Sequence, residues 1–378
     1  MANTPPSLQA LAAGAPPRNP NVRTLAKYAA NSSCRLATLG FAARVDFDKL
    51  LAGTRFAAPF GQSPFAFRRG NRFEETLREN GHAPLLGLLG EALDYDTANA
   101  RVENLRKGAG RTMEDRSVRT RALVKEIVSG KRGAPNLLDG AVLSRSIGGT
   151  MAYFEADAVA AHFERPIHAG EIKSFPTVDG QADPDKMGAA IAQVSIYILL
   201  LRELAEEVGG KADQVTDQAL VITAKNTGLQ PTIVVKSVGR EIDRAARILA
   251  QAPTADQLAK DLSPRVPGFG VVAAGDPVAR IEAAHELAEQ VGTNYRPECL
   301  SSCGLSRLCR HRAREEGCAS RVGSHLVRLL PNIDNLDRAT ELADGAKPTA
   351  DEQSVAEQLQ RAAKLRLAFA PTDKRGRR

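Results

Sequence analysis

The feature that most constrains the fold is a long apolar segment, Met187–Val208, which lies between two pairs of short β-type segments. Its apolar residues recur at helical spacing. Before it, residues 151–159 (MAYFEADAV) and 169–175 (AGEIKSF) have the composition of strands. After it, ALVITAK and TIVVKSV predict a hairpin that turns at residues 226–231. The order strand, strand, helix, strand, strand predicts an α/β core.

Composition divides the rest of the chain. Residues 1–22 are rich in Pro, Ala and Asn without an apolar period, which predicts a disordered lead-in to a main domain over residues 23–330. In residues 84–149 apolar side chains recur at helical spacing among many arginines, which predicts a helical insert that could follow a phosphate backbone. Helices are also expected over residues 238–251 and 277–291.

The C-terminal residues 331–378 predict a helical extension. Its best amphipathic stretch is Gln353–Phe369, and it ends in a basic tail, Lys374–Arg378. We expect this extension to be a docking site for a protein partner.

Charge and composition narrow the classes of partner. Lys and Arg total 51 against 44 Asp and Glu, and the net charge of +7 suits an anionic partner as well as ordinary solubility. Aromatic residues make up only 4% of the chain, so contacts to nucleic acid would be mostly electrostatic. No window approaches the roughly 18 apolar residues that span a bilayer, and no secretion signal opens the chain. We therefore expect a cytoplasmic protein without membrane contact.

Three residues carry the clearest chemical pattern: Asp157, Glu171 and Lys173. Glu171 and Lys173 are two apart in an expected strand, so they share a face. Carboxylate oxygens suit Mg²⁺ or Mn²⁺, such an ion activates water for phosphodiester hydrolysis, and the backbone carbonyl of Ile172 could be a further ligand. A Glu-x-Lys pair is also common on solvated strands.

Gln193 and Tyr197 are four residues apart on the apolar helix and therefore project from one face. Buried polar groups need partners, and a metal-bound phosphate or a DNA strand would be one. A pair satisfied within the core is the simpler alternative.

Taken in order, these motifs resemble those of RecB-like nucleases of the PD-(D/E)XK superfamily, a group with AddB-type and CRISPR-adaptation exonucleases. The resemblance implies a restriction-endonuclease-like core, a mixed sheet flanked by helices. It also implies metal ligands at Asp157 and Glu171, a catalytic lysine at Lys173, and DNA-positioning roles for Gln193 and Tyr197.

An upstream segment, Arg69–Glu75 (RGNRFEE), resembles the first motif of that family, in which Arg-Gly is followed closely by His-Glu. Glu74 matches the acidic position. Phe73 stands where histidine is often found, which leaves the ligand of this motif open. An N-terminal helical turn with favourable acidic residues is the alternative.

The cysteines form a second pattern, Cys299-x3-Cys303-x5-Cys309-x8-Cys318. Four thiolates can hold zinc or an iron-sulfur cluster, and the spacing lacks the Cys-x2-Cys pairs typical of structural zinc sites. Disulfides are rare in the cytosol. A local set of these four cysteines is one ligand arrangement.

The resemblance to RecB-like nucleases implies another ligand set. The iron-sulfur members of that family take one cysteine from before the nuclease core and three from after it. Cys34, Cys299, Cys303 and Cys309 match that pattern and would hold a [4Fe-4S] cluster as a structural clasp. Cys318 would then be spare.

The sequence as a whole predicts a metal-dependent DNA nuclease, an exonuclease acting on single-stranded ends in DNA repair, CRISPR adaptation or antiviral defence. A helicase, integrase or defence-system subunit is the expected protein partner. The alternatives are a catalytically inactive iron-sulfur subunit that binds nucleic acid, and a zinc-bearing scaffold with the acidic residues on its surface.

Overall fold

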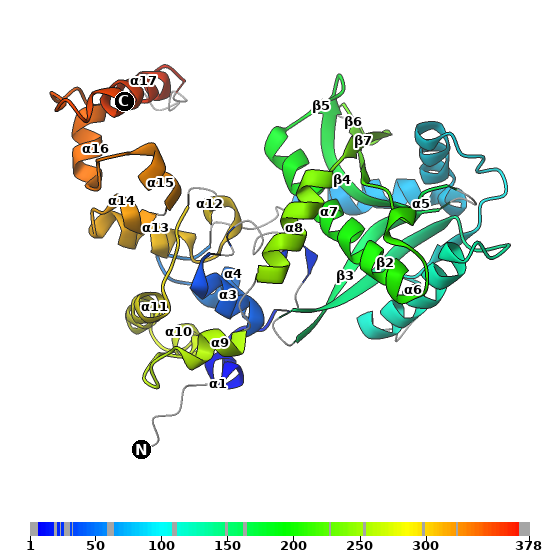
Figure 1. Cartoon of the computed structure of the whole chain (residues 1–378), viewed down its shortest axis with the longest axis horizontal. Helices are drawn as coiled ribbons and strands as arrows, with labels where there is room; N and C mark the ends of the chain where they lie inside the picture. Colours follow the sequence, from blue (N-terminus) through cyan, green and yellow to red (C-terminus); the bar gives the residue numbers. More distant parts are fainter. Residues whose placement is uncertain are drawn as a thin grey trace. The chain divides into compact units, whose positions relative to one another are not determined.

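The computed structural model divides the chain into two compact units, each described here by itself (Figure 1). Unit 1 comprises Met1–Pro17, Ser33–Phe60 and Leu258–Arg378, and unit 2 comprises Arg18–Ser32 and Gly61–Gln257. The structure describes residues 7–18, 21, 22, 24, 25, 31, 33–58, 64–107, 112–147, 150–161, 165–226, 228–251, 255–296, 299–322 and 324–369. The main domain expected over residues 23–330 is thus divided between two units.

Unit 2 is built on a seven-stranded mixed sheet with the order β1-β2-β3-β4-β6-β7, and β5 pairs with β4 off this path. The strands are β1 (Val102–Asn104), β2 (Leu137–Ile147), β3 (Thr150–Ala160), β4 (His168–Val178), β5 (Gln181–Ala182), β6 (Gln218–Lys225) and β7 (Pro231–Ser237). The pairs β2–β3, β3–β4, β4–β5 and β6–β7 are antiparallel, whereas β1–β2 and β4–β6 are parallel. The predicted α/β core with flanking helices is confirmed.

Helix α7 (Pro184–Glu207) is the crossover that makes β4 and β6 parallel. Asp183 caps it by accepting hydrogen bonds from the amides of Asp185 and Lys186, and Pro184 occupies the first turn, where no amide partner is needed. Its Met187 and Ala190 pack on Val221 of β6. The helix expected over residues 187–208 is therefore confirmed.

Helix α5 (Pro64–Leu93) covers the other face of the sheet. Its Phe73 and Leu77 pack with Leu220 and Ile222, which alternate along β6 with Val221, the residue that faces α7. The helix is interrupted by non-helical backbone from Glu79 to His82. Helices α6 (Met113–Val128) and α8 (Gly239–Gln251) also belong to the unit, with α6 against β2 and α8 against α7.

One expectation about membranes needs correction. By length and composition α7 is apolar enough to cross a membrane, with a mean hydropathy of 1.5 over its most apolar window. The structure buries 61% of that window, as is typical of a core helix that packs against a sheet.

Unit 1 is helical in its described part. It contains α1 (Leu8–Ala12), α3 (Arg35–Ala42), α4 (Phe47–Leu50), the second half of α9 (Ala255–Lys260), α10 (Phe269–Ala273), α11 (Pro277–Val291), α12 (Cys299–Ser302), α13 (Ser306–Glu315), α14 (Ala319–Val322), α15 (Ser324–Leu329), α16 (Leu336–Ala343) and α17 (Gln353–Phe369). Leu11, Leu39, Phe269 and Leu287 lie in one core. The helices expected over residues 277–291 and 353–369 are confirmed with the same bounds.

Two segment predictions differ from the structure. Residues 84–149, expected to form a helical insert, contain β1 and the eleven-residue strand β2 as well as helix. Within the lead-in expected to be disordered, Leu8–Ala12 form α1, and Leu11 is 1% exposed because it packs in the core of unit 1. Residues 1–6, 19 and 20 and the basic tail lie outside the described residues.

Candidate active site

The predicted motif residues of unit 2 meet where β3 and β4 separate. The two strands pair from Ala158↔Gly170 to Ala160↔His168, and the pairing ends one residue before Asp157 and Glu171. Beyond this point the amide of Ile172 donates to the side chain of Asp157, at 2.9 Å from Oδ2, and not to a backbone carbonyl of β3. A register shift between Ile172 and Pro176 marks an irregularity in β4 beside this point. Such irregularities redirect side chains and are common near active sites.

Glu171 is deeply buried, with its side chain 4% exposed. Burial, and next the negative charge of Asp157, raise the pKa of Glu171 to about 7, against the opposing effects of Lys173 and Tyr197. Glu171 Oε2 is buried without a hydrogen-bond partner among the described residues. A buried carboxylate oxygen without a partner is costly, so this atom is suited to accept a proton or a cation.

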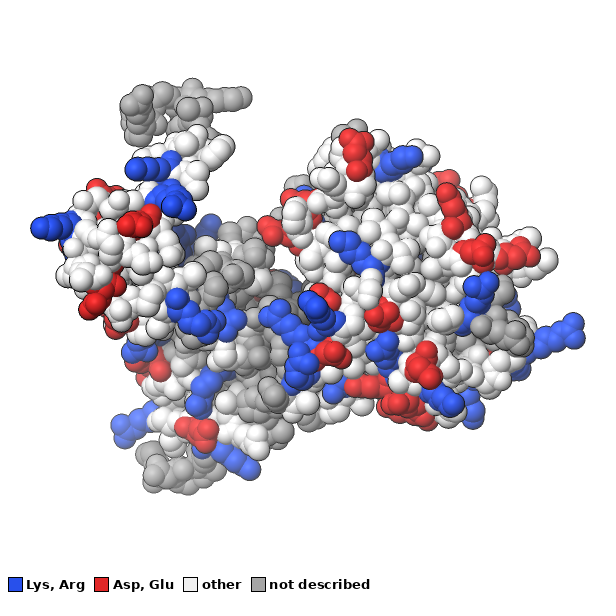
Figure 2. Space-filling model, turned by 45° about the horizontal axis from the view of Figure 1, so that its top comes forward, with Lys and Arg blue, Asp and Glu red and all other residues white. Residues whose placement is uncertain are grey.

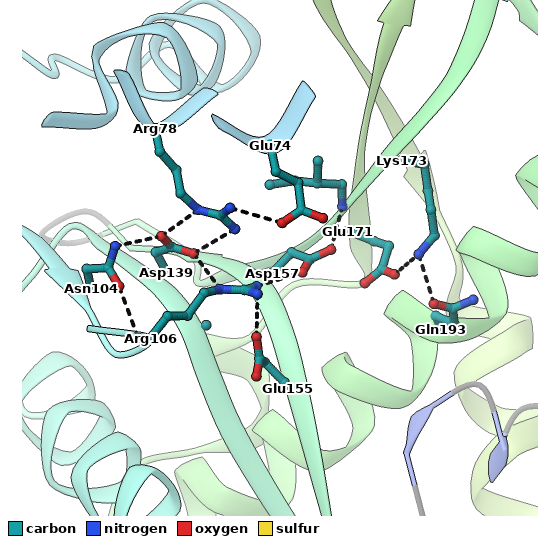
Figure 3. A network of polar contacts seen from close by, with 12 residues as sticks. Glu74, Arg78, Asn104, Arg106, Asp139, Glu155, Asp157, Glu171, Lys173 and Gln193 are labelled. Atoms are coloured by element: carbon teal, nitrogen blue, oxygen red, sulfur yellow. Dashed lines mark hydrogen bonds and ion pairs between the residues drawn. The ribbon is translucent and has the colours of Figure 1, made fainter. Parts of the chain in front are cut away.

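Lys173 lies next to Glu171, and Gln193 holds it from the other side (Figure 3). The ammonium group donates to Glu171 Oε1 and, at 3.2 Å, to Gln193 Oε1. Gln193 is 6% exposed. The amide on α7 therefore fixes a lysine on β4, as expected for residues that act together.

Tyr197 lies one turn further along α7 and is 2% exposed. Burial, followed by the charge of Glu171, raises the pKa of Tyr197 well above its usual value, so its hydroxyl stays protonated and interacts with Glu171. Gln193 and Tyr197 thus have partners within the protein, and those partners are the candidate catalytic residues.

Asp157 is engaged by protein groups at both oxygens. Besides the bond from the Ile172 amide to Oδ2, Arg106 Nη2 donates to Oδ1 at 2.7 Å. Arg106 also forms an ion pair with Glu155, which precedes Asp157 by two residues on β3 and so shares its face. Glu155 is not among the site residues predicted from the sequence, although it lies two residues before Asp157 on an expected strand.

Asp139 on β2 is a buried carboxylate that the sequence analysis missed. It is 1% exposed and accepts hydrogen bonds from Arg78, Arg106, Asn104 and His82 at distances between 2.8 and 3.3 Å. Burial opposes ionisation of Asp139, but the bond from His82 and the charge and bonds of Arg78 outweigh it and lower its pKa. Asp139 is the single charged residue in the apolar run LLDGAVL, and this is the feature of the sequence that indicates a buried carboxylate.

The first predicted motif lies on α5. Glu74 accepts a hydrogen bond at 2.9 Å from Arg78, which connects it to Asp139 and places it at the margin of the network (Figure 3). Phe73, at the position where the family often has histidine, is fully buried in the core and cannot be a ligand. Arg69 donates to the carbonyl oxygens of Ser174 and Gly228, so it connects α5 to the strands.

Many arginines of the expected insert are paired with acidic side chains. Arg116 binds Glu155, Arg119 binds Glu103 and Arg121 binds Glu207. Figure 2 shows basic and acidic side chains interspersed on the face it presents. These three arginines of α6 therefore hold unit 2 together as well as adding positive charge.

The cysteines are a separate group in unit 1. Burial, together with the charges of Cys303, Cys34 and Cys299, raises the pKa of the Cys309 thiol well above its usual value. Cys34 lies in the core of unit 1, and Cys303 and Cys309 pack against that core. Cys318 is instead bound to Asp334 Oδ2, with 3.5 Å between the sulfur and oxygen.

The described side chains include no group of three or more His, Cys, Asp or Glu arranged to hold a metal ion. At the fork of β3 and β4 the expected set contains only two carboxylates, Asp157 and Glu171, together with the carbonyl of Ile172.

Comparisons with known proteins add little. No family model matches the chain, and no curated protein matches it. Among solved structures, the crystal structure of SSO0001 is similar over 52% of this chain and 90% of that chain, with 10% sequence identity and a TM-score of 0.18. A TM-score this low carries no argument about fold or function.

Proposed function

We propose that unit 2 is a metal-dependent deoxyribonuclease with a PD-(D/E)XK core of the RecB-like type. The observation that carries the proposal is the convergence of Asp157, Glu171, Lys173, Gln193 and Tyr197, which come from two strands and a crossover helix, around one buried carboxylate. In a purely structural ion pair both carboxylate oxygens can accept hydrogen bonds from the protein. A cation ligand needs an oxygen that no donor occupies, and Glu171 Oε2 has no donor among the described residues.

The donor set fits Mg²⁺ or Mn²⁺. Glu171 Oε2 is buried without a partner, Asp157 is close enough to raise the pKa of Glu171, and both ions prefer oxygen ligands. We assign Asp157, Glu171 and the carbonyl of Ile172 as the ligands. A divalent cation there would polarise the phosphate and lower the pKa of water.

The remaining residues orient the proposed metal ligands and stabilise charge on the phosphate. Lys173, held between Glu171 and Gln193, presents its ammonium group beside the phosphate and stabilises charge as the phosphodiester bond breaks. The protonated hydroxyl of Tyr197 interacts with Glu171 from within the core. Glu74 reaches the site only through Arg78 and is assigned a supporting role at the DNA-facing margin.

The proposed substrate is single-stranded DNA, attacked from an end. Aromatic residues make up 4% of the chain and tryptophan is absent, so binding should depend on charge, fall steeply with salt and show no sequence preference. DNA repair, CRISPR adaptation and antiviral defence are the processes that use such activity, with a helicase, integrase or defence-system subunit as partner.

Unit 1 would hold a [4Fe-4S] cluster through Cys34, Cys299, Cys303 and Cys309. The donor chemistry fits, because these four cysteines supply thiolates and their charges act on one another, although the described side chains do not form a preformed metal site. A reducing cytoplasm would keep these thiols reduced, the state in which they can bind iron. Since Cys34 lies far in sequence from the other three, the cluster would tie together distant segments of unit 1.

The test is hydrolysis of end-labelled single- and double-stranded DNA with Mn²⁺ or Mg²⁺. We expect the wild-type protein to release nucleotides from ends, and Lys173→Ala and Glu171→Ala each to lose at least about a hundredfold in rate, as for removal of one group that stabilises transition-state charge. Lys125→Ala and Glu91→Ala, which remove exposed charges from α6 and α5, are the controls. Wild-type DNA binding without cleavage under either metal would refute the nuclease.

A non-catalytic nucleic-acid-binding subunit is the second candidate. The observation in its favour is that protein groups already engage both oxygens of Asp157. The same assay separates the candidates, because a binding subunit would retain DNA without releasing nucleotides.

A further inference from the structure

Arg106 is the cation at the centre of the candidate site. It follows β1 and reaches three carboxylates, with Nε 3.0 Å from Asp139 Oδ1, Nη2 2.7 Å from Asp157 Oδ1, and an ion pair to Glu155 (Figure 3). Burial disfavours its charge, but Asp157, Glu155 and Asp139 outweigh this and raise its pKa. The guanidinium group thus neutralises residues of two strands.

The backbone of β2 makes room for Arg106 at Gly140. This glycine has a φ of +76°, and the β2–β3 ladder passes from Asp139↔Ala158 to Ala141↔Ala156 without a pair at Gly140. A Cβ at Gly140 would lie 2.7 Å from Arg106 Nε and 2.8 Å from Arg116 Nη2. The strand therefore has a hollow that only glycine leaves open and that the two arginines fill.

Of the two hydrogen bonds that Asp157 accepts, the one from Arg106 is the one that a cation could replace. Asp157 Oδ2 is bound by the backbone amide of Ile172, which is fixed by β4, whereas among the described residues Oδ1 is bound by the side chain of Arg106 alone. If Arg106 releases Asp157, it keeps its ion pairs with Asp139 and Glu155, so its charge is not left buried and unpaired.

We propose that Arg106 is a positioning residue that competes with the divalent cation for Asp157, and that its freed Nη2 donates to a phosphate oxygen of the DNA. The inference rests on the proposed nuclease site and adds a coupling to it. Arg106 weakens cation binding when no DNA is present, and DNA offsets this by giving the freed donor an acceptor. Cation and DNA should therefore each strengthen the binding of the other.

The test measures two affinities that should change in opposite directions. Mn²⁺ binding is measured by titration calorimetry without DNA, and single-stranded DNA binding is measured by fluorescence anisotropy with Mn²⁺ in the Lys173→Ala background. Arg106→Gln should bind Mn²⁺ about tenfold more tightly or better, because it removes the charge-assisted hydrogen bond that occupies Asp157 Oδ1. It should bind DNA more weakly, with a salt slope smaller by about 0.7, the share of one phosphate contact to a single strand.

Two further variants distinguish the proposed role of Arg106 from a general loss of folded structure. Gly140→Ala should displace the Arg106 side chain while leaving its chemistry intact, and it should shift both affinities in the same directions as Arg106→Gln. Arg121→Gln removes the same charge from an exposed pair with Glu207 and should change neither affinity. Circular dichroism checks the fold, which Arg78, His82 and Arg116 should maintain around Asp139 and Glu155.

The outcomes separate the inference from the proposed function. Suppose that the wild-type protein binds Mn²⁺ and Glu171→Ala does not. If Arg106→Gln then leaves the Mn²⁺ affinity unchanged or weakens it, the proposed role of Arg106 is refuted and the cation site stands. If neither the wild-type protein nor Arg106→Gln binds Mn²⁺, both ideas fail.

Discussion

Proton competition at Glu171 gives a quantitative prediction for cation binding. Burial and Asp157 raise the pKa of Glu171 from 4.5 to about 7, which corresponds to about 3 kcal/mol in favour of the protonated form. Below pH 7 the folded protein therefore holds a proton on Glu171, and a cation must displace it. Mn²⁺ affinity should fall about tenfold for each pH unit below 7 and level off above it.

Calorimetry at several pH values, in buffers with different ionisation enthalpies, measures both the affinity and the protons released. Binding should release about 0.9 proton at pH 6 and about 0.1 at pH 8, as expected for a group with a pKa near 7. From pH 8 to pH 5.5 the wild-type affinity should drop roughly thirtyfold, whereas a glutamate with an ordinary pKa would produce a change of less than about twofold. Glu91→Gln, at an exposed position on α5, should behave as wild type.

A flat affinity between pH 5.5 and 8, with no proton release, would show that Glu171 is ionised without the cation. The argument from its buried, unpartnered oxygen would then be wrong.

Two further predictions concern unit 1. Cys34→Ser should lose the broad visible absorption and the iron of an anaerobically purified protein, whereas Cys318→Ser, whose thiol is bound to Asp334, should keep both; the reverse result would favour the local set of cysteines. Gly270→Ala would place a Cβ against the carbonyl oxygen of Ala13 and should cost about 1–3 kcal/mol in thermal unfolding followed by circular dichroism, while Gly87→Ala in α5 meets no neighbour and should be neutral or stabilising.

The sequence predicted the elements whose side chains repeat with a clear local period. Strands β3 and β4, helix α7 and the β6–β7 hairpin all lie within a few residues of the expected bounds, because one face of each is apolar and the period differs between helix and strand. Gln193 was expected to face a metal-bound phosphate or DNA strand or to find a partner within the core, and the structure joins it to Lys173 by a hydrogen bond.

Strand β2 and the arginine network could not be predicted in the same way. Asp139 and Gly140 interrupt the apolar run of β2, and they are compatible with a strand only because Arg78, His82 and Arg106 approach from segments that are distant in sequence. Local propensity does not encode such partners, since the cost of burying Asp139 is offset by tertiary contacts alone.

The division of unit 1 into separate chain segments has a consequence for its synthesis on the ribosome. Leu36, Leu39 and Leu50 emerge early, but the core that buries them includes Phe269 and Leu287 from the C-terminal segment. Roughly 200 residues are translated in between, which takes on the order of 10–40 s. During that interval unit 2 has all of its residues and can fold, while the nascent N-terminal helices expose leucines, so chaperones that bind apolar segments should associate with this chain before its translation ends.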